Sequence, residues 1–393
     1  MAGPRWRYRW TLLSTCVLAY FATRVGQVAI GALVPAITET FSVSSSSIGA
    51  ALTGMWVAYA LSQVPSGALC DRVGERRVVL LAVAVAGVGA LVLAGAPSFP
   101  VFAATAVALG GGVGLYYTAG TVLLTSGAEN PAQAIGLHRL GGELAGIVAP
   151  VGSVGIAVWF GWRGALLACA LVTVPVLSLV VLRVRPTPST DGSEPGTESG
   201  FDRRALLTIT RRPTLVAATA VASLAEFVAI ATITFLPALL IGLHGVSAGF
   251  AGVLLTTYFL AVALSQPAAG RLSDRFSWDI VTACVLLVGS GGYALLALAP
   301  GPDWVVPAVV LSGVAMGWNG PVQAHVLATL SERDRGAGFG AMRTTYILLG
   351  ALGGVVTGTV ADWAGWESAT WLLAATLLVA VPVVLSDRVR GTD

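Results

Sequence analysis

The stretch that decides the fold runs from residue 64 to residue 80 and reads VPSGALCDRVGERRVVL. An apolar run breaks at Gly67, passes through a charged cluster that includes Asp71 and Arg72, and then becomes apolar again. A related stretch, ALSQPAAGRLSDRFS, occupies residues 263–277. Short charged interruptions of this kind between long apolar runs indicate connections between membrane-spanning segments.

The composition of the chain indicates an integral membrane protein. Of its 393 residues, 56% are hydrophobic and only 10% are charged, with a mean hydropathy of +0.83. A soluble domain has about a quarter charged residues. Crossing the hydrocarbon core takes roughly twenty helical residues. The apolar runs also lack the period-two alternation of a barrel, so we predict an all-α protein. Its twelve transmembrane helices are predicted at 11–35, 48–70, 77–96, 99–124, 135–159, 163–182, 213–241, 249–270, 279–299, 303–330, 337–361 and 366–386.

The basic residues predict the orientation. All 22 are arginine, and nineteen of them lie in or beside one alternating set of connections, whereas the other set carries only Arg163 alongside acids such as Glu39, Asp303 and Glu367. The positive-inside rule therefore predicts a multi-pass protein of the cell membrane with both termini in the cytoplasm. The net charge of +3 reflects this topology rather than a nucleic-acid partner. The four cysteines have no metal-ligand spacing, so we expect no metal and no cofactor.

The two halves of the chain are similar to each other. A polar segment at 186–200 predicts a flexible linker, which divides the chain into a six-helix bundle at 1–182, a cytoplasmic linker at 183–212 and a second bundle at 213–393. One offset of about 203 residues pairs the halves by the following matches: Ala60-Leu61-Ser62-Gln63 with Ala263-Leu264-Ser265-Gln266, Asp71-Arg72 with Asp274-Arg275, Gly110 with Gly313, Gly114 with Gly317, and Gly161-Trp162 with Gly365-Trp366. The sequence therefore predicts two parallel, pseudo-symmetric repeats.

The motif Gly67-x-x-x-Asp71-Arg72-x-Gly74, placed after the second helix of such a repeat, resembles the loop motif of the major facilitator superfamily of secondary transporters. Here Glu75 takes the first of the basic positions that usually end the motif, and in the second copy Ser277 stands where the later glycine would be. The resemblance covers the whole chain. It implies a protein that is not an enzyme and that moves a small solute by alternating access.

The motif residues form a predicted conformational latch. Gly67 allows close helix packing, and Gly74 permits a tight reversal of the chain. Asp71 is placed to accept hydrogen bonds at a helix N-terminus, which the resemblance assigns to the helix that starts at 336–338. Arg76 and Arg77 also have a simpler interpretation as topological anchors. The latch residues are Gly67, Asp71, Arg72, Gly74 and Arg76, with Asp274 and Arg275 in the second copy.

Two ionisable residues lie near the middle of predicted helices, where charges are costly and usually functional. These are Arg24 on the first helix and Glu226 on the seventh. The resemblance implies that both helices line the central cavity. We predict that Glu226 carries a proton for coupling. Arg24 pairs with Glu226, binds a substrate anion, or does each in turn, and a permanent ion pair between the two stays open as an alternative.

Weaker candidates complete the predicted site. Polar and aromatic residues on cavity-type helices are expected either to contact substrate or to pack between helices, namely Gln27, Tyr116, Tyr117, Trp318, Asn319 and Gln323. Charged residues nearer the cytoplasmic side predict an ion-pair gate or anchors, namely Arg139, Glu143 and Arg343. The expected partners are a small-molecule substrate, the bilayer and a proton gradient, acting on a monomer.

Several functions compete with this interpretation. The small residues of 141–150, ending in Ala149-Pro150, resemble in degraded form the glycine-proline motif of drug-proton antiporters. Residues 245–249 fit the G-x-S-x-G pattern of hydrolases, but they lie between membrane helices, where Ser247 and its counterpart in 43–49 are expected to be helix caps. The glycines of 110–114 are expected to serve helix packing rather than nucleotide binding. A channel would need a filter-like loop. Drug efflux and anion transport stay open.

Overall fold

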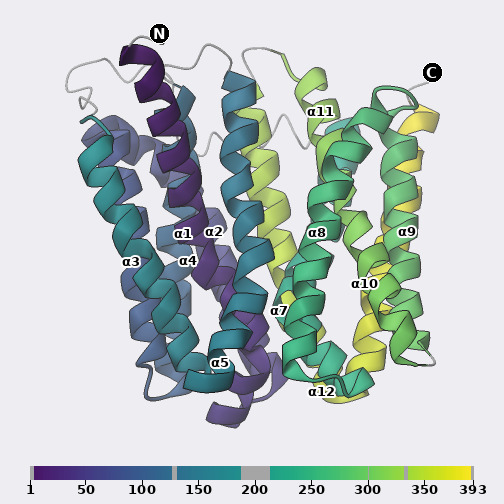
Figure 1. The fold of residues 1–393 in the computed structure, drawn as a ribbon. Coiled ribbons are helices and arrows are strands. Elements are labelled where there is room, and N and C mark those ends of the chain that lie inside the picture. Colours follow the sequence, from purple (N-terminus) through teal and green to yellow (C-terminus); the bar gives the residue numbers. More distant parts are fainter. Residues whose placement is uncertain (1–3, 126–130, 187–212, 300, 332–334, 391–393) are drawn as a thin grey trace. The chain divides into compact units, whose positions relative to one another are not determined.

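A computed structural model describes residues 4–125, 131–186, 213–299, 301–331 and 335–390. In this part of the chain the secondary structure is helical throughout, with short connections (Figure 1). The linker predicted at 183–212 lies almost entirely outside the described residues. The helices are α1 (Pro4–Phe41), α2 (Ser45–Val73), α3 (Glu75–Ala94), α4 (Phe99–Thr125), α5 (Pro131–Arg183), α7 (Pro213–His244), α8 (Ala248–Ser273), α9 (Trp278–Leu298), η1 (Pro302–Trp304), α10 (Val305–Val314), η2 (Ala315–Trp318), α11 (Asn319–Thr329) and α12 (Arg335–Arg390).

The predicted twelve membrane helices are present. Nine stretches of the described residues are long and apolar enough to cross a membrane. Two of them, Gln133–Arg183 and Gly338–Ser386, each hold two helices joined at a kink. The remaining helix is α2, whose more polar sequence keeps it outside those nine stretches.

The kinks confirm the internal repeat. The break in α5 is at Gly161 (φ 68°, ψ 172°), and the break in α12 is at Gly365 (φ 82°, ψ 168°). Both are left-handed conformations that glycine adopts without steric cost. The tryptophan after each glycine packs back on the end of the first helix of its repeat. Trp162 donates a hydrogen bond to Thr40 Oγ1 at 2.9 Å, and Trp366 lies against Gly242.

Paired glycines also occupy equivalent contacts in the two halves. A side chain on Gly110 would meet the carbonyl oxygen of Met55, and one on Gly313 would meet that of Tyr258. Met55 and Tyr258 are themselves separated by the repeat offset. The glycines of 110–114 therefore serve close helix packing.

The predicted span 303–330 is present as one membrane-crossing stretch, Val305–Thr329. Within it the 3-10 turn η2 separates α10 from α11, and the short turn η1 precedes it. Pro321 has no N–H to donate to the carbonyl of Gly317, and Gly317 also approaches the Ser265 carbonyl of α8 closely. The 3-10 turn at Ala315–Trp318 accommodates both features.

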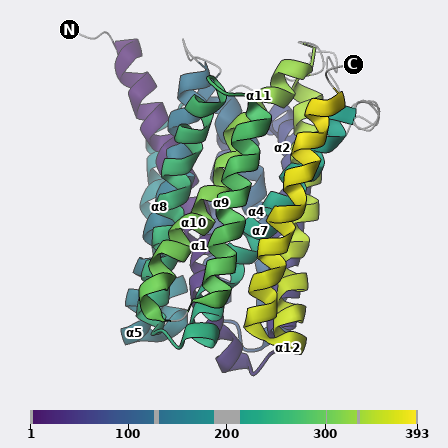
Figure 2. The ribbon, with the colours of Figure 1, turned by 90° about the vertical axis from the view of Figure 1, so that its right-hand side faces the viewer.

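The chain forms two compact units. The N-terminal unit comprises Met1–Phe41 and Gly54–Gly200, and the C-terminal unit comprises Ser42–Thr53 and Phe201–Asp393. In the N-terminal unit α1 packs against α5 and α3 against α4. In the C-terminal unit α12 packs against α7 and α9, and the views in Figures 1 and 2 show α9 beside α12. The first turns of α2 belong to the C-terminal unit.

Within the C-terminal unit, the first turns of α2 are bound to α12. Both carboxylate oxygens of Asp362 accept backbone hydrogen bonds, from Ser45 at 3.0 Å and Ser46 at 2.7 Å. Further along α2, the Thr53 hydroxyl donates to the Ala351 carbonyl at 2.8 Å and accepts from the Val355 amide at 3.0 Å. This hydroxyl bridges the two groups that a regular helix would pair directly. Side-chain insertion of this kind bends helices.

Thr53→Val is expected to lower the free energy of unfolding by about 1 kcal/mol, because Val keeps the shape of the side chain but makes neither hydrogen bond. Thermal unfolding of the purified protein in detergent measures the change. The matched control is Thr105→Val, since the Thr105 hydroxyl bonds only to the Val101 carbonyl of its own helix, at 2.8 Å. Equal stability of the two variants would contradict the structural role of Thr53.

The predicted serine caps are present. Ser44 Oγ accepts from the Ser47 amide at 3.2 Å, and Ser247 Oγ accepts from the Phe250 amide at 3.2 Å. The G-x-S-x-G match at 245–249 is therefore a helix start.

The reversal after the second helix of each repeat differs between the halves. Gly74 has φ 83°, as expected from its predicted role in a tight turn. The counterpart, Ser277, has φ 149° and ψ 153°, a region of backbone conformation that is essentially limited to glycine. The second copy of the motif thus keeps the turn of the first copy without the residue that suits it.

Ser277→Gly is expected to stabilise the protein by about 1 kcal/mol. Relief of the strained conformation contributes about 1–3 kcal/mol, and the extra flexibility of glycine in the unfolded chain offsets part of it. Thermal unfolding of the variant should show a higher midpoint. The inverse substitution, Gly74→Ser, should lower it, and a lower midpoint for Ser277→Gly would show that the conformation carries no strain.

Candidate functional site

Arg24 of α1 is the centre of a polar site in the N-terminal unit. Its guanidinium donates to Gln27 Oε1 at 2.5 Å, one turn further along the helix. It also lies over the rings of Trp56 and Tyr59 of α2, with Cζ 5.1 Å and 5.8 Å from the two centroids. These distances are typical of cation–π contacts. Trp56 and Tyr59 were not predicted, although their spacing of three residues on one helix face is a signal that the sequence carries.

Two further groups complete this site. The amide nitrogen of Gln27 is buried, and it has no hydrogen-bond partner among the described residues. Glu143 of α5 lies near enough that the charges of Arg24 and Arg139 both act on its carboxylate. The close packing of α5 on α1 positions it, because Gly141 meets the carbonyl of Val17. The structure thus brings together Arg24, Gln27 and Glu143, which the sequence had placed in separate groups.

Tyr116 is a core residue in this structure. It was predicted to contact substrate or to pack between helices, and its side chain is fully buried. Its hydroxyl donates to the Cys16 carbonyl at 2.5 Å and lies 3.1 Å from His138 Nε2. Its ring stacks on Tyr20. Tyr117 is half-buried and faces the same histidine. Tyr20 and His138 were not predicted, because the sequence shows neither which way a helix is rotated nor which aromatic residues meet.

Glu226 of α7 lies in a second polar cluster, in the C-terminal unit. Gly350 of α12 packs directly on its side chain, and its charge acts on Tyr258 of α8. Nearby, the Tyr293 hydroxyl is 2.5 Å from that of Thr232. The predicted pairing of Arg24 with Glu226 would join the two units and stays a prediction.

The remaining cavity candidates of this unit lie on the divided helix. Trp318 ends η2, is 1% exposed, and contacts Tyr346 edge-on. Like Tyr116, it is a buried residue rather than an accessible one. Asn319 begins α11 and Gln323 follows one turn later, and both are half-buried.

The motif residues lie at the ends of helices. Asp71 and Arg72 are exposed in the last turn of α2, and Gly67 is half-buried. Arg76, one of the predicted latch residues, donates to the Val181 carbonyl near the end of α5 at 2.8 Å. Asp274 and Arg275 are exposed after α8.

The predicted gate residues belong to two different units. Arg139 and Glu143 are one turn apart on α5, as expected. Arg343 is half-buried on α12 of the other unit. The predicted role of Asp71 at 336–338 also joins the two units, and it stays a prediction.

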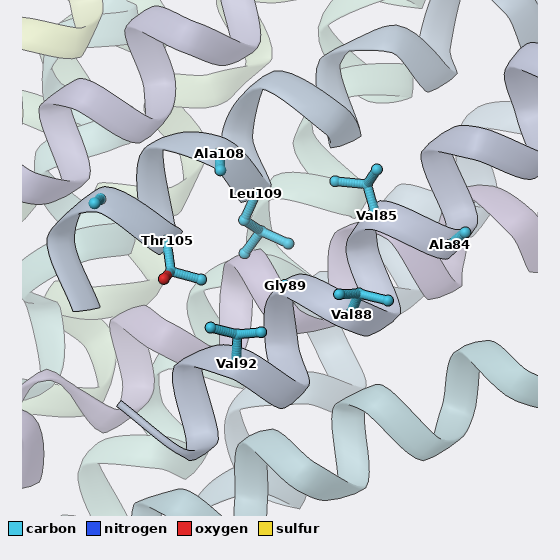
Figure 3. A pocket seen from close by; sticks show the side chains of 9 residues that line it. Ala84, Val85, Val88, Gly89, Val92, Thr105, Ala108 and Leu109 are labelled. Atoms are coloured by element: carbon cyan, nitrogen blue, oxygen red, sulfur yellow. The ribbon is translucent and has the colours of Figure 1, made fainter. Parts of the chain in front are cut away.

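A groove between α3 and α4 lies apart from these polar sites (Figure 3). It has a volume of about 490 Å³ and is lined by apolar side chains such as Val88 and Val92, with Gly89 at its base. The hydroxyl of Thr105, its polar lining residue, bonds to its own helix. Val88 is 59% exposed, so this groove faces the lipid chains in a membrane. Among the described residues, no group of His, Cys, Asp and Glu could hold a metal ion.

Twelve membrane helices in two six-helix repeats, each with isolated charged residues inside it, define a secondary transporter. The chain belongs to the Major Facilitator Superfamily, whose family model matches residues 16–248 and 218–392. The members of this family are transporters rather than enzymes, as the sequence predicted. The protein is therefore a multi-pass membrane transporter that binds a small-molecule substrate in the membrane.

Curated relatives of similar length carry different names. The chain is 26% identical over 377 residues to a chloramphenicol resistance protein of Streptomyces lividans, covering 93% of this chain and 94% of the relative. It is 27% identical over 384 residues to the probable nitrate/nitrite transporter NarK2 of Mycobacterium tuberculosis, covering 89% of each. A 4-hydroxybenzoate transporter of Pseudomonas aeruginosa is 26% identical over 190 residues, covering 47% of this chain and 41% of the relative.

Solved transporter structures share the fold. A bacterial homologue of the human lysosomal transporter Spinster has a TM-score of 0.81 at 19% identity and covers 99% of this chain and 98% of its own. The nucleoside transporter NupG has a TM-score of 0.79 at 14% identity and covers 96% of this chain and 98% of its own. At these identities the likeness concerns the fold alone.

Proposed function

We propose that this protein is a proton-coupled transporter of small organic or inorganic anions, and that it works as a monomer by alternating access. The arginine-rich connections support a position in the cell membrane with both termini in the cytoplasm. The proposal rests chiefly on the site around Arg24.

The observation that carries the proposal is the set of donors at this site. Arg24 has no acceptor capacity, and its described hydrogen bond goes to a neutral amide oxygen. The N–H groups of the Gln27 side-chain amide beside it can still donate hydrogen bonds. Two adjacent donors, one of them charged, suit a carboxylate or a similar anion. The names of two relatives, a nitrate/nitrite transporter and a 4-hydroxybenzoate transporter, specify anionic solutes.

Glu226 supports the proton coupling. It is an ionisable residue within a membrane helix, where a charge is costly and usually marks a pathway or proton site. Gly350 brings α12 onto its side chain, so the carboxyl group is held within the bundle. A group that can lose its charge by taking a proton suits this position better than a permanent charge.

Efflux of a hydrophobic drug is the second candidate. It is supported by the chloramphenicol resistance protein among the relatives and by the aromatic pair Trp56 and Tyr59, whose centroids are 5.5 Å apart and whose side chains are each 4% exposed, so the pair must open to receive a solute. Aromatic surfaces bind apolar solutes without needing a charge. This candidate gives Arg24 no direct role.

A thermal-shift screen on the purified protein separates the two candidates. The solutes are nitrate, 4-hydroxybenzoate, glucose 6-phosphate and chloramphenicol, each tested between about pH 5 and about pH 8. A ligand at a hundred times its dissociation constant stabilises a protein by about 2.7 kcal/mol. Stabilisation by the anions supports the proposal. Stabilisation by chloramphenicol alone would replace it with the drug candidate.

A further inference from the structure

His138 of α5 is enclosed in the core of the N-terminal unit. Its side chain has no exposed surface. Three tyrosine rings surround the imidazole, with centroid distances of 5.1 Å to Tyr20, 5.6 Å to Tyr116 and 6.1 Å to Tyr117. Neither the transport site around Arg24 nor the predicted latch uses this histidine.

The hydrogen bonds define which nitrogen of His138 carries the proton. The Tyr116 hydroxyl has one hydrogen, and the Cys16 carbonyl at 2.5 Å can only accept it. The same hydroxyl oxygen must therefore accept from His138 Nε2, at 3.1 Å. The neutral imidazole is thus protonated at Nε2, and Nδ1 presents a lone pair.

That lone pair is not satisfied by the protein. Nδ1 is buried and has no hydrogen-bond partner among the described residues. A buried acceptor without a partner costs about 1–3 kcal/mol. If His138 served only to hold Tyr116, the hydrogen bond from Nε2 would suffice. The free-energy cost of burying Nδ1 without a partner would then be offset by nothing. The arrangement makes sense if Nδ1 receives a proton during the working cycle.

We propose that His138 is a proton-binding site of this transporter, separate from Glu226, and that the proton binds at Nδ1. One N–H bond forms at the Nδ1 lone pair, while Nε2 keeps its hydrogen bond to Tyr116. The resulting positive charge faces the Tyr20 and Tyr116 rings within the distance of about 6 Å at which cation–π attraction operates.

The surroundings make proton binding reversible. The titratable and charged groups around His138 are Cys16 and Tyr20 on α1, Tyr116 and Tyr117 on α4, and Arg139 beside it on α5. The tyrosine rings favour the charged imidazole, whereas burial and Arg139 oppose it. The site can therefore be filled and emptied as the protein changes state.

The test uses nitrogen NMR on the full-length protein in lipid nanodiscs. The chain has three histidines, so the double variant His244→Gln and His325→Gln leaves His138 as the only labelled imidazole and keeps the site itself intact. At about pH 8 the signal should be that of the neutral form protonated at Nε2. Between about pH 8 and about pH 4 more than half of it should convert, reversibly, to the doubly protonated form.

Tyr116→Phe provides the second measurement. It keeps the ring and removes the hydroxyl, so the preference for protonation at Nε2 should be lost while the acidic conversion persists. A signal protonated at Nδ1 at about pH 8, or no conversion by about pH 4 in a protein that stays folded, would overturn the proposal. Because the readout is proton binding and not transport, its outcome is independent of whether Glu226 couples protons.

Discussion

Arg24→Ala is expected to weaken, by about 100-fold, the binding of the anion that stabilises the protein in the thermal-shift screen. Hydrogen bonds from a charged donor contribute about 1.5–3 kcal/mol, and about 1.4 kcal/mol corresponds to a factor of ten. The loss would also leave the Gln27 amide as the only donor of the pair. Isothermal titration in detergent measures the dissociation constant. Binding of chloramphenicol, which carries no anionic group, should change little.

The controls distinguish the loss of the Arg24 donor from a general effect of removing an arginine. Arg77→Ala removes an exposed arginine of the same unit, and it should bind that anion as the unchanged protein does. Arg24→Lys keeps the charge but loses the planar pair of donors, so its affinity should fall between the two. Unchanged affinity in Arg24→Ala would show that the anion is held elsewhere.

Glu226→Gln is expected to abolish solute accumulation driven by a pH gradient while leaving solute exchange intact. The amide keeps the size and polarity of the side chain but cannot carry a proton through the cycle. Accumulation into proteoliposomes should fall to the level reached without a pH gradient. Exchange of labelled for unlabelled anion needs no net proton movement and should continue.

Glu367→Gln is the matched control, because it makes the same chemical change at an exposed acid. It should leave both accumulation and exchange unchanged. If Glu226→Gln accumulates solute as well as the control does, the proton is carried by another group. If it loses exchange as well, Glu226 acts in substrate binding or in folding instead of coupling.

Helix positions could be predicted from the sequence because apolar length follows directly from bilayer thickness. The repeat offset also predicted which residues of the two halves are equivalent, and the shared backbone conformation of Gly161 and Gly365 confirms this. The division of 303–330 could not be predicted in the same way. It depends on how closely Gly317 approaches α8, and hydropathy carries no information about helix contacts.

The charged residues of the candidate site could be predicted from the sequence, whereas the aromatic and histidine residues around them could not. Arg24 and Glu226 are conspicuous because ionisable residues are rare in membrane helices. Trp56 and His138 are residue types that do not stand out in a membrane sequence. Their roles depend on which helix faces pack together. The rotation of each helix decides this, and it also places Tyr116 inside the core rather than on an accessible surface.

Solute uptake into proteoliposomes under an imposed pH gradient tests the central claim most directly. The unchanged protein is supplied with the labelled anion that stabilises it in the thermal-shift screen, with and without a protonophore. Our account predicts accumulation above the outside concentration that collapses when the protonophore is added, and no accumulation in Arg24→Ala. Accumulation that persists with the protonophore, or that is equal in Arg24→Ala, would contradict proton-coupled anion transport through this site.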